Sequence, residues 1–275
     1  MNRLSLFYDI AGRLSKDSQI DKFFTVGGII IPTCDEVSIR NAIGRDMPKW
    51  TNSNPASLSL IANIFRNHAI HCTVVKIQKT EPAWTNFWNA GEKQSRHLSS
   101  KTKSKTGFAK PANVLKYLSL SKCFAISLGL YIRLQGVPNI LDQHGFSALC
   151  LKVVCDTDIQ GQENQQVLKK DVEDWCKDTS LTTQLEIKPY IEVIEFQTEQ
   201  EDILLLLPDY FAGYVHYSSA PQHIALPANL SPHDAKQFGV TLSTSGRFNL
   251  KEHSFDERFP NLISGENSIK SFEKT

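Results

Sequence analysis

One short segment of the sequence limits the fold more than any other. Residues 149–155 read Leu-Cys-Leu-Lys-Val-Val-Cys and are almost continuously apolar. A strand that is apolar on both sides must be covered on both faces of its sheet, as a central strand between two layers of helices is. The sequence therefore predicts an α/β fold in which this strand lies inside the sheet.

The rest of the pattern places strands and helices around this central strand. Apolar and β-branched runs predict further strands at residues 4–9, 23–31, 71–77 and 190–196. Helical spacing predicts helices at residues 35–45, 57–68, 110–134, 165–179 and 208–217. A leading hairpin followed by alternating helix and strand predicts a mixed, five-stranded sheet flanked by helices.

The chain has 275 residues, which is enough for one large domain with insertions. We predict an α/β domain over residues 1–217, with an insertion at about 78–110 that follows neither strand nor helix spacing. Residues 218–275 contain several prolines and a candidate strand around 240–250, and they predict a partly irregular C-terminal extension.

Charge and cysteine usage limit the environment of the protein. The formal net charge is +1, so there is no overall field that attracts nucleic acid or membrane. The six cysteines include no Cys-x-x-Cys pair and several lie in apolar runs, which is typical of reduced core residues. No apolar stretch has the length of a signal-peptide core or a membrane span. We therefore expect a soluble, cytoplasmic protein without a membrane partner.

Three aspartates each stand at an end of an apolar run. Asp9 closes the first predicted strand, Asp156 closes the central strand, and Asp209 follows an apolar run at the start of the last predicted helix. Strand tips and helix N-termini can gather carboxylates from distant parts of a sequence, and gathered carboxylates bind divalent metal. We predict Asp9, Asp156 and Asp209 as catalytic and metal-binding residues.

Each aspartate also has a purely structural interpretation. Asp209 in a first helical turn would interact favourably with the helix dipole. Asp156 starts a good turn sequence, in which Asp158 is a rival ligand. Asp9 at a strand end could form a surface ion pair.

Two residues after Asp209 share its helical face. Gly213 lacks a side chain, so another element could approach the helix there. His216 could shuttle protons, although a packed histidine is the more common role.

Four short segments carry a family resemblance. They are residues 7–12 (Phe-Tyr-Asp-Ile-Ala-Gly), 24–30 (Phe-Thr-Val-Gly-Gly-Ile-Ile), 153–156 (Val-Val-Cys-Asp) and 205–213 (Leu-Leu-Leu-Pro-Asp-Tyr-Phe-Ala-Gly). Together they resemble the prokaryotic family called domain of unknown function 3800. Its landmarks are an opening Asp-Glu-Ser-Gly-like motif, a Gly-Gly second strand, an Asp in the fourth strand and a late Gln-x-Ala-Asp-x-x-Ala-Gly helix.

The resemblance implies a ribonuclease H-like fold, which the predicted order of strands and helices also favours. It implies a metal-dependent nuclease that acts on DNA or RNA, in some members as part of defence against phage and with a protein partner. Asp9, Asp156 and Asp209 match the acidic positions of the family. The implied cofactor is Mg²⁺ or Mn²⁺, because oxygen ligands suit these hard cations and no His/Cys spacing resembles a zinc site.

The opening motif departs from the family pattern. Ile10 and Ala11 stand where the family usually has Glu and Ser, and Leu206 and Pro208 replace the Gln and Ala of the late helix. The missing acid lowers the negative charge that is available for metal. The alternatives are a site for one ion where relatives bind two, or a catalytically inactive subunit that binds nucleic acid or forms a complex. A small-molecule phosphohydrolase would use the same metal site.

A substitute acid is expected between the last predicted strand and the last helix. The candidates there are Glu195, Glu199, Glu201 and Asp202. We predict Glu199 as the additional metal ligand, although acidic runs of this kind usually face solvent or cap a helix.

A run of cations suggests where nucleic acid would bind. Residues 93–110 contain no acid and six positive side chains: Lys93, Arg96, Lys101, Lys103, Lys105 and Lys110. We predict that these residues follow phosphates in a basic loop, with Trp84, Phe87 or Trp88 stacking on bases. A flexible loop that these aromatic residues anchor to the core fits the sequence equally well.

Overall fold

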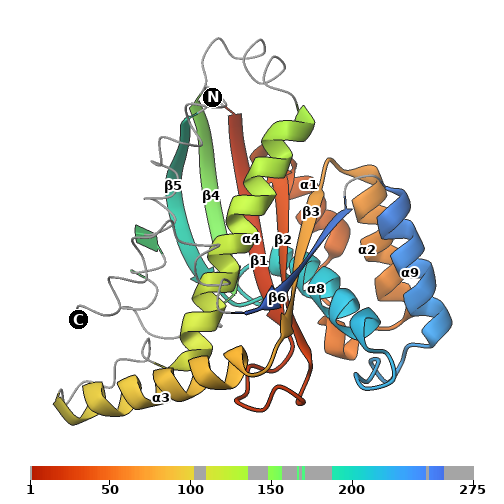
Figure 1. Cartoon of the computed structure of the whole chain (residues 1–275). Coiled ribbons are helices and arrows are strands. Elements are labelled where there is room, and N and C mark those ends of the chain that lie inside the picture. The colour runs from red at the N-terminus through yellow and green to blue at the C-terminus, as the bar shows by residue number, and fades with distance from the viewer. Residues whose placement is uncertain are drawn as a thin grey trace.

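A mixed sheet forms the centre of the computed structural model, which describes residues 2–101, 110–135, 148–156, 166, 169–170, 188–245 and 248–256 (Figure 1). Within these residues the sheet has six strands in the order β5-β4-β1-β2-β3-β6. Their bounds are β1 Asn2–Ala11, β2 Phe23–Pro32, β3 His71–Lys79, β4 Ala148–Asp156, β5 Lys188–Gln197 and β6 Phe248–Phe255.

The strand directions divide the sheet into two parts. β1, β2 and β3 form an antiparallel meander. β4 runs parallel to β1, β5 runs parallel to β4, and β6 runs parallel to β3. β4 lies between β1 and β5 with Leu151 and Val154 fully buried, so the prediction of an interior strand is confirmed. The predicted α/β class with a mixed sheet and flanking helices is also confirmed.

Helices cover both faces of the sheet, and each layer has its own apolar core (Figure 1). One face carries α3 (Ala83–Lys101) and α4 (Pro111–Gln135). The other carries α1 (Glu36–Ile43), α2 (Pro55–Asn67), α8 (Leu206–Ser219) and α9 (Pro232–Thr244). Among these described helices, none is long and apolar enough to cross a bilayer.

Two adjacent glycines in β2 let helices approach both faces of the sheet. A Cβ atom on Gly27 would lie 2.5 Å from the carbonyl oxygen of Pro208 in α8. A Cβ atom on Gly28 would lie 2.5 Å from the Tyr8 ring and 2.9 Å from Sγ of Cys123 in α4. Successive residues of a strand point to opposite faces, so the pair serves both layers and holds α8 close to the centre of the sheet.

The predicted irregular insertion at 78–110 is wrong over most of its length. β3 continues to Lys79, and residues 83–101 form α3. Trp84, Phe87 and Trp88 lie one helical turn apart and pack together against the core. The polar residues that follow Trp88 hid this spacing in the sequence.

The region after residue 217 also differs from its prediction. Residues 232–244 form α9, which starts at a capping box between Ser231 and Asp234, so the candidate strand at 240–250 was placed too early. The strand is β6, and its pairing with β3 raises the number of strands from five to six. The domain boundary at 217 stays a prediction, and the predicted helix at 165–179 lies almost entirely outside the described residues.

Candidate metal centre

Three carboxylates converge at one edge of the sheet. Asp9, Asp156 and Glu199 each offer one oxygen, and these three oxygens lie within 4.8 Å of one another. Asp9 and Asp156 belong to the ends of β1 and β4, and Glu199 follows β5 by two residues. Since β1, β4 and β5 are parallel neighbours, their C-terminal ends meet at the same edge. Sequence positions almost 200 residues apart thus contribute to one site.

Asp209 belongs to the same electrostatic environment, although its oxygens are not among the three that meet within 4.8 Å. Its Oδ2 accepts a hydrogen bond of 2.7 Å from the backbone N–H of Trp50. Burial raises the pKa of Asp209 to about 6, and the charges of Glu199 and Asp156 add to this effect. The Trp50 N–H and the positive charge of Lys49 oppose it.

The start of α8 differs slightly from its prediction. The helix begins at Leu206 rather than at Pro208, directly after the 3₁₀ turn η4 (Ile203–Leu205). Pro208 is accepted there because the first helical turn leaves its N–H groups without intrahelical partners. Asp209 is therefore the fourth residue of α8, close enough to Glu199 and Asp156 for their charges to act on it.

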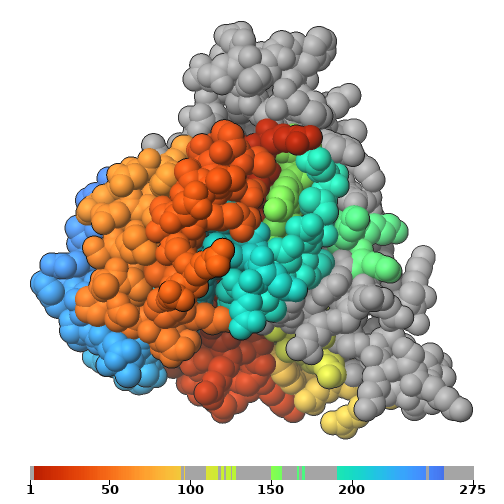
Figure 2. All heavy atoms as spheres, turned by 180° about the vertical axis from the view of Figure 1, so that it is seen from behind, coloured from red at the N-terminus to blue at the C-terminus, as the bar shows by residue number. Residues whose placement is uncertain are grey.

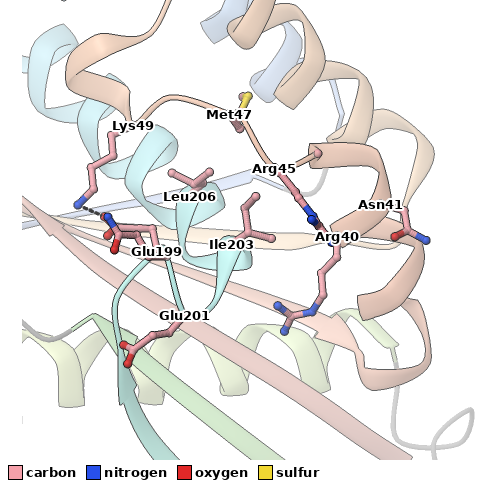
Figure 3. A pocket seen from close by; sticks show the side chains of 11 residues that line it. Arg40, Asn41, Arg45, Met47, Lys49, Glu199, Glu201, Ile203 and Leu206 are labelled. Carbon is pink, nitrogen blue, oxygen red and sulfur yellow. Dashed lines mark ion pairs between the residues drawn. The ribbon is translucent and has the colours of Figure 1, made fainter.

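Lys49 is a member of the site that sequence reasoning missed. Its ammonium group forms an ion pair with Oε1 of Glu199 (Figure 3). Burial lowers the pKa of Lys49, but the hydrogen bond to Glu199 and the charges of Glu199, Asp156 and Asp209 raise it above its ordinary value. No motif or spacing marks this lysine in the sequence, because it lies in a loop between two short helices.

The loop that carries Lys49 is fixed against α8. The indole of Trp50 packs directly on Gly213, where a Cβ atom would lie 2.3 Å from its Cδ1. The hydroxyl of Tyr210 donates a hydrogen bond of 2.9 Å to the carbonyl oxygen of Pro48. The space that Gly213 was expected to leave is therefore filled by this loop.

A buried ion-pair network holds the start of α8 in place. Arg40 of α1 donates two hydrogen bonds to Asp202, at 2.6 and 2.8 Å, and one of 3.1 Å to Glu36. Burial opposes the charge of Arg40, but these hydrogen bonds raise its pKa above the ordinary value. Asp202 also accepts a hydrogen bond from the N–H of Leu204 in η4. The network thus joins α1 to η4 and thereby fixes α8.

The four acidic candidates before α8 have different roles in the structure. Asp202 belongs to the Arg40 network. Glu201 accepts hydrogen bonds from the backbone and side chain of Thr198, within its own turn. Glu195 accepts a hydrogen bond from Gln197. Glu199 is the member that joins Asp9 and Asp156, as its selection from the sequence predicted.

A groove opens beside the carboxylates, with a volume of about 890 Å³. Arg45 and Lys49, from the segment after α1, lie along one side, and Glu199 and Glu201 lie along the other (Figure 3). Figure 2 shows these two segments side by side on the surface, the first in orange-red and the second in teal. The groove thus reaches Glu199 of the acidic group, and the cations Arg40, Arg45 and Lys49 line it.

His216 lies on α8 and is not a member of the group of three carboxylates. A Cβ atom on Gly12 would lie 2.7 Å from its Cε1, and its Nε2 is 3.8 Å from Oδ2 of Asp21. Burial lowers the pKa of His216, Asp21 raises it and Lys79 lowers it. His216 therefore packs against the connection between β1 and β2, as its structural interpretation predicted.

The predicted basic loop is placed only in part. Lys93 and Arg96 are exposed on α3, and Lys110 is exposed just before α4. Lys101 is the last residue of α3, and Lys103 and Lys105 lie outside the described residues.

The proposed stacking of Trp84 on nucleic-acid bases is wrong. Trp84 is fully buried, and its Nε1 donates hydrogen bonds to the carbonyl oxygens of Ser15 and Lys16. Trp88 is buried beside it, and Phe87 packs against the same core. These aromatic residues anchor α3, which is the alternative that the sequence also allowed.

The acidic group could hold a metal ion. Its three converging donors are all carboxylate oxygens, which are the ligands of hard divalent cations. The five described cysteines are free thiols, and the four buried ones lie in strands or in α4 rather than in this group.

Comparison with known proteins does not identify a family. No protein-family model matches the sequence, and a search of curated proteins also gives no match. A function must therefore be inferred from the sheet, the carboxylates and the groove.

Proposed function

We propose that the protein is a divalent-metal-dependent nuclease or phosphodiesterase. The observation that carries the proposal is the meeting of Asp9, Asp156 and Glu199 within 4.8 Å at the ends of three parallel strands. Mg²⁺ or Mn²⁺ is the proposed cofactor, because carboxylate oxygens suit both ions. When bound, such an ion stabilises charge on a phosphate and lowers the pKa of a bound water.

A ribonuclease H-like fold is part of the proposal. The order β3-β2-β1-β4-β5, with an antiparallel meander followed by two parallel strands, supports it. A Gly-Gly second strand and a glycine in the late helix are landmarks of the domain of unknown function 3800 family. The close packing at Gly27 and Gly213 gives a physical reason for both. Membership of that family, and a role in defence against phage, remain proposals.

The residues of the site have distinct proposed roles. Asp9, Asp156 and Glu199 hold the cation. Asp209, with a pKa raised to about 6, can exchange a proton at Oδ1 near neutral pH, because its Oδ2 is held by the Trp50 N–H. The groove beside Glu199 admits the phosphate, and the cations along it attract the substrate.

Cleavage assays with matched variants test this proposal. Purified protein would be incubated with single- and double-stranded DNA and RNA in the presence of Mn²⁺, beside Asp156→Asn and Glu201→Gln. We expect metal-dependent cleavage that Asp156→Asn loses and Glu201→Gln keeps, because Glu201 lies in the groove but not in the acidic group. Cleavage that persists in Asp156→Asn, or no cleavage of any substrate, contradicts the proposal.

A second candidate function is a catalytically inactive subunit that binds nucleic acid. Ile10 favours it, because the residue after Asp9 brings no carboxylate to the site. The exposed side chains of Lys93, Arg96 and Lys110 could contact phosphates without any chemistry. Salt-dependent binding of nucleic acid without cleavage in the same assay would support this function.

A further inference from the structure

Residues 47–50, which we call the strap, supply positive groups to one side of the acidic site. The ammonium group of Lys49 forms an ion pair with Glu199. The backbone N–H of the next residue, Trp50, donates its hydrogen bond to Asp209. Two consecutive residues thus contact Glu199 and Asp209, while Asp9 and Asp156 come from the strands.

The strap is held in place independently of the carboxylates. Trp50 is buried and packs edge-on against Tyr210, with ring centroids 6.0 Å apart. The hydroxyl of Tyr210 donates to the carbonyl oxygen of Pro48, and Gly213 leaves the room that the indole fills. The backbone of Lys49 is therefore fixed on both sides, which distinguishes this ion pair from a mobile surface pair.

The position of Lys49 bears on the number of metal ions. In a two-metal site the ions lie about 4 Å apart, and carboxylates around the pair hold both of them. Here a second ion would have to share Glu199 with the first ion and take Asp209 as a further ligand, and the strap already contacts both residues. A divalent ion placed there would be repelled by the nearby ammonium group, because like charges at short range interact strongly away from bulk water.

We propose that Lys49 takes the place of a second divalent cation, so that the acidic group binds a single ion. The inference rests on the proposed function in treating the carboxylates as a metal site. Lys49 also lines the groove, and there its charge would stabilise a phosphate on the side that a second ion covers in two-metal sites. Lys49 would thus be a positioning residue, which supplies a fixed positive charge beside the carboxylates.

Titration of metal-free protein with Mn²⁺ tests the inference without any assay of cleavage. Calorimetry and Mn²⁺ electron paramagnetic resonance would count the ions in wild type, Lys49→Met, Lys49→Arg and Arg45→Met. We expect one ion in wild type. Lys49→Met should bind the first ion about tenfold more tightly and gain a second, because it removes one nearby positive charge.

The two other variants are controls. Lys49→Arg keeps the charge and should still bind one ion. Arg45→Met removes a cation of the same groove that, among the residues drawn in Figure 3, forms no ion pair with a carboxylate, and it should match wild type. Two ions in wild type, or the same number and affinity in Lys49→Met as in wild type, overturn the inference.

The outcomes separate this inference from the nuclease proposal. One ion in wild type without cleavage leaves the inference standing and removes the nuclease. Cleavage with two ions in wild type supports the nuclease and overturns the single-ion inference. If neither wild type nor any variant binds Mn²⁺, both proposals are overturned. The side chain of Lys49 is 53% exposed, so its replacement should fold. If Lys49→Met does not fold, the number of ions that wild type binds still tests the inference.

Discussion

Two groups of carboxylates lie on the same face of the sheet and differ in how their charge is balanced. In the first, Arg40 and Lys152 contact Glu36, and Arg40 also binds Asp202. We call this group the Arg40 network. Its two acids are matched by two cations, and Asp202 is only 3% exposed.

Among the residues that the structure describes, the second group has more acids than bases. It contains Asp9, Asp156, Glu199 and Asp209, and Lys49 is the cation that contacts it by an ion pair among the described residues. The difference indicates two roles, because a balanced network stabilises a fold whereas an excess of carboxylate calls for a further cation. The four predictions below test this comparison, from the largest expected effect to the smallest.

Breaking the balanced group should have the largest effect on stability. Arg40→Met should lower the free energy of unfolding by about 3 kcal/mol, because it leaves Asp202 buried without its cation. Urea denaturation measures the change. Lys49→Met is the matched control and should lower stability by less, about 1 kcal/mol, because the side chain of Lys49 is 53% exposed whereas that of Arg40 is 29% exposed. Equal effects of the two variants would remove the distinction between the groups.

Adding a cation should stabilise the unbalanced group. Mn²⁺ at a hundred times its dissociation constant should raise the free energy of unfolding of wild type by about 2.7 kcal/mol. Asp156→Asn should gain much less, because it removes one of the three converging ligands. Thermal unfolding with and without Mn²⁺ measures the gain, and Glu201→Gln should gain as much as wild type does. A similar gain in Asp156→Asn would place the ion elsewhere.

Moving α8 should change the distance between Asp209, which lies on this helix, and the carboxylates at the ends of the strands. Gly27→Ala puts a methyl group 2.5 Å from the carbonyl oxygen of Pro208, so it should destabilise the fold by about 2 kcal/mol. It should also weaken Mn²⁺ binding, because Asp9 pairs with Gly27 and Asp209 follows Pro208. Denaturation and calorimetry measure the two effects. Unchanged Mn²⁺ affinity in a destabilised variant would mean that α8 does not set the geometry of the site.

The smallest effect concerns pH. The pKa of Asp209 is raised from 3.8 to about 6 in the fold, so the native state binds this proton more tightly than the unfolded chain does. Wild type should therefore lose stability as the pH rises from about 4 to 6, and Asp209→Asn should not. At pH 8 and without metal, the variant should be the more stable of the two proteins.

Unfolding curves of both proteins from pH 3.5 to 8 measure this difference. Asn keeps an oxygen that can accept the Trp50 N–H, so the comparison isolates the charge. A constant difference over the whole range would show that the effect is not caused by ionisation of Asp209.

Much of the fold could be predicted from local pattern. The strands of the meander, the interior strand β4 and the long helix α4 follow from runs of apolar residues, since burial requires those runs. The wrong predictions concern segments in which the spacing of apolar residues is weak. In α3 three aromatic residues are followed by polar ones, and α9 occupies the first half of the segment 240–250 that was expected to form a strand.

The sequence by itself determined that Asp9 and Asp156 stand near strand ends, because an apolar run leads up to each of them. Asp9 is nevertheless buried, and β1 continues to Ala11. The sequence also offered Glu199, but as one of four acids. The tertiary structure decided which acids meet, because the order of parallel strands sets which ends are neighbours. It alone decided the place of Lys49, since contacts of Trp50 with α8, more than 150 residues away, bring that lysine to Glu199.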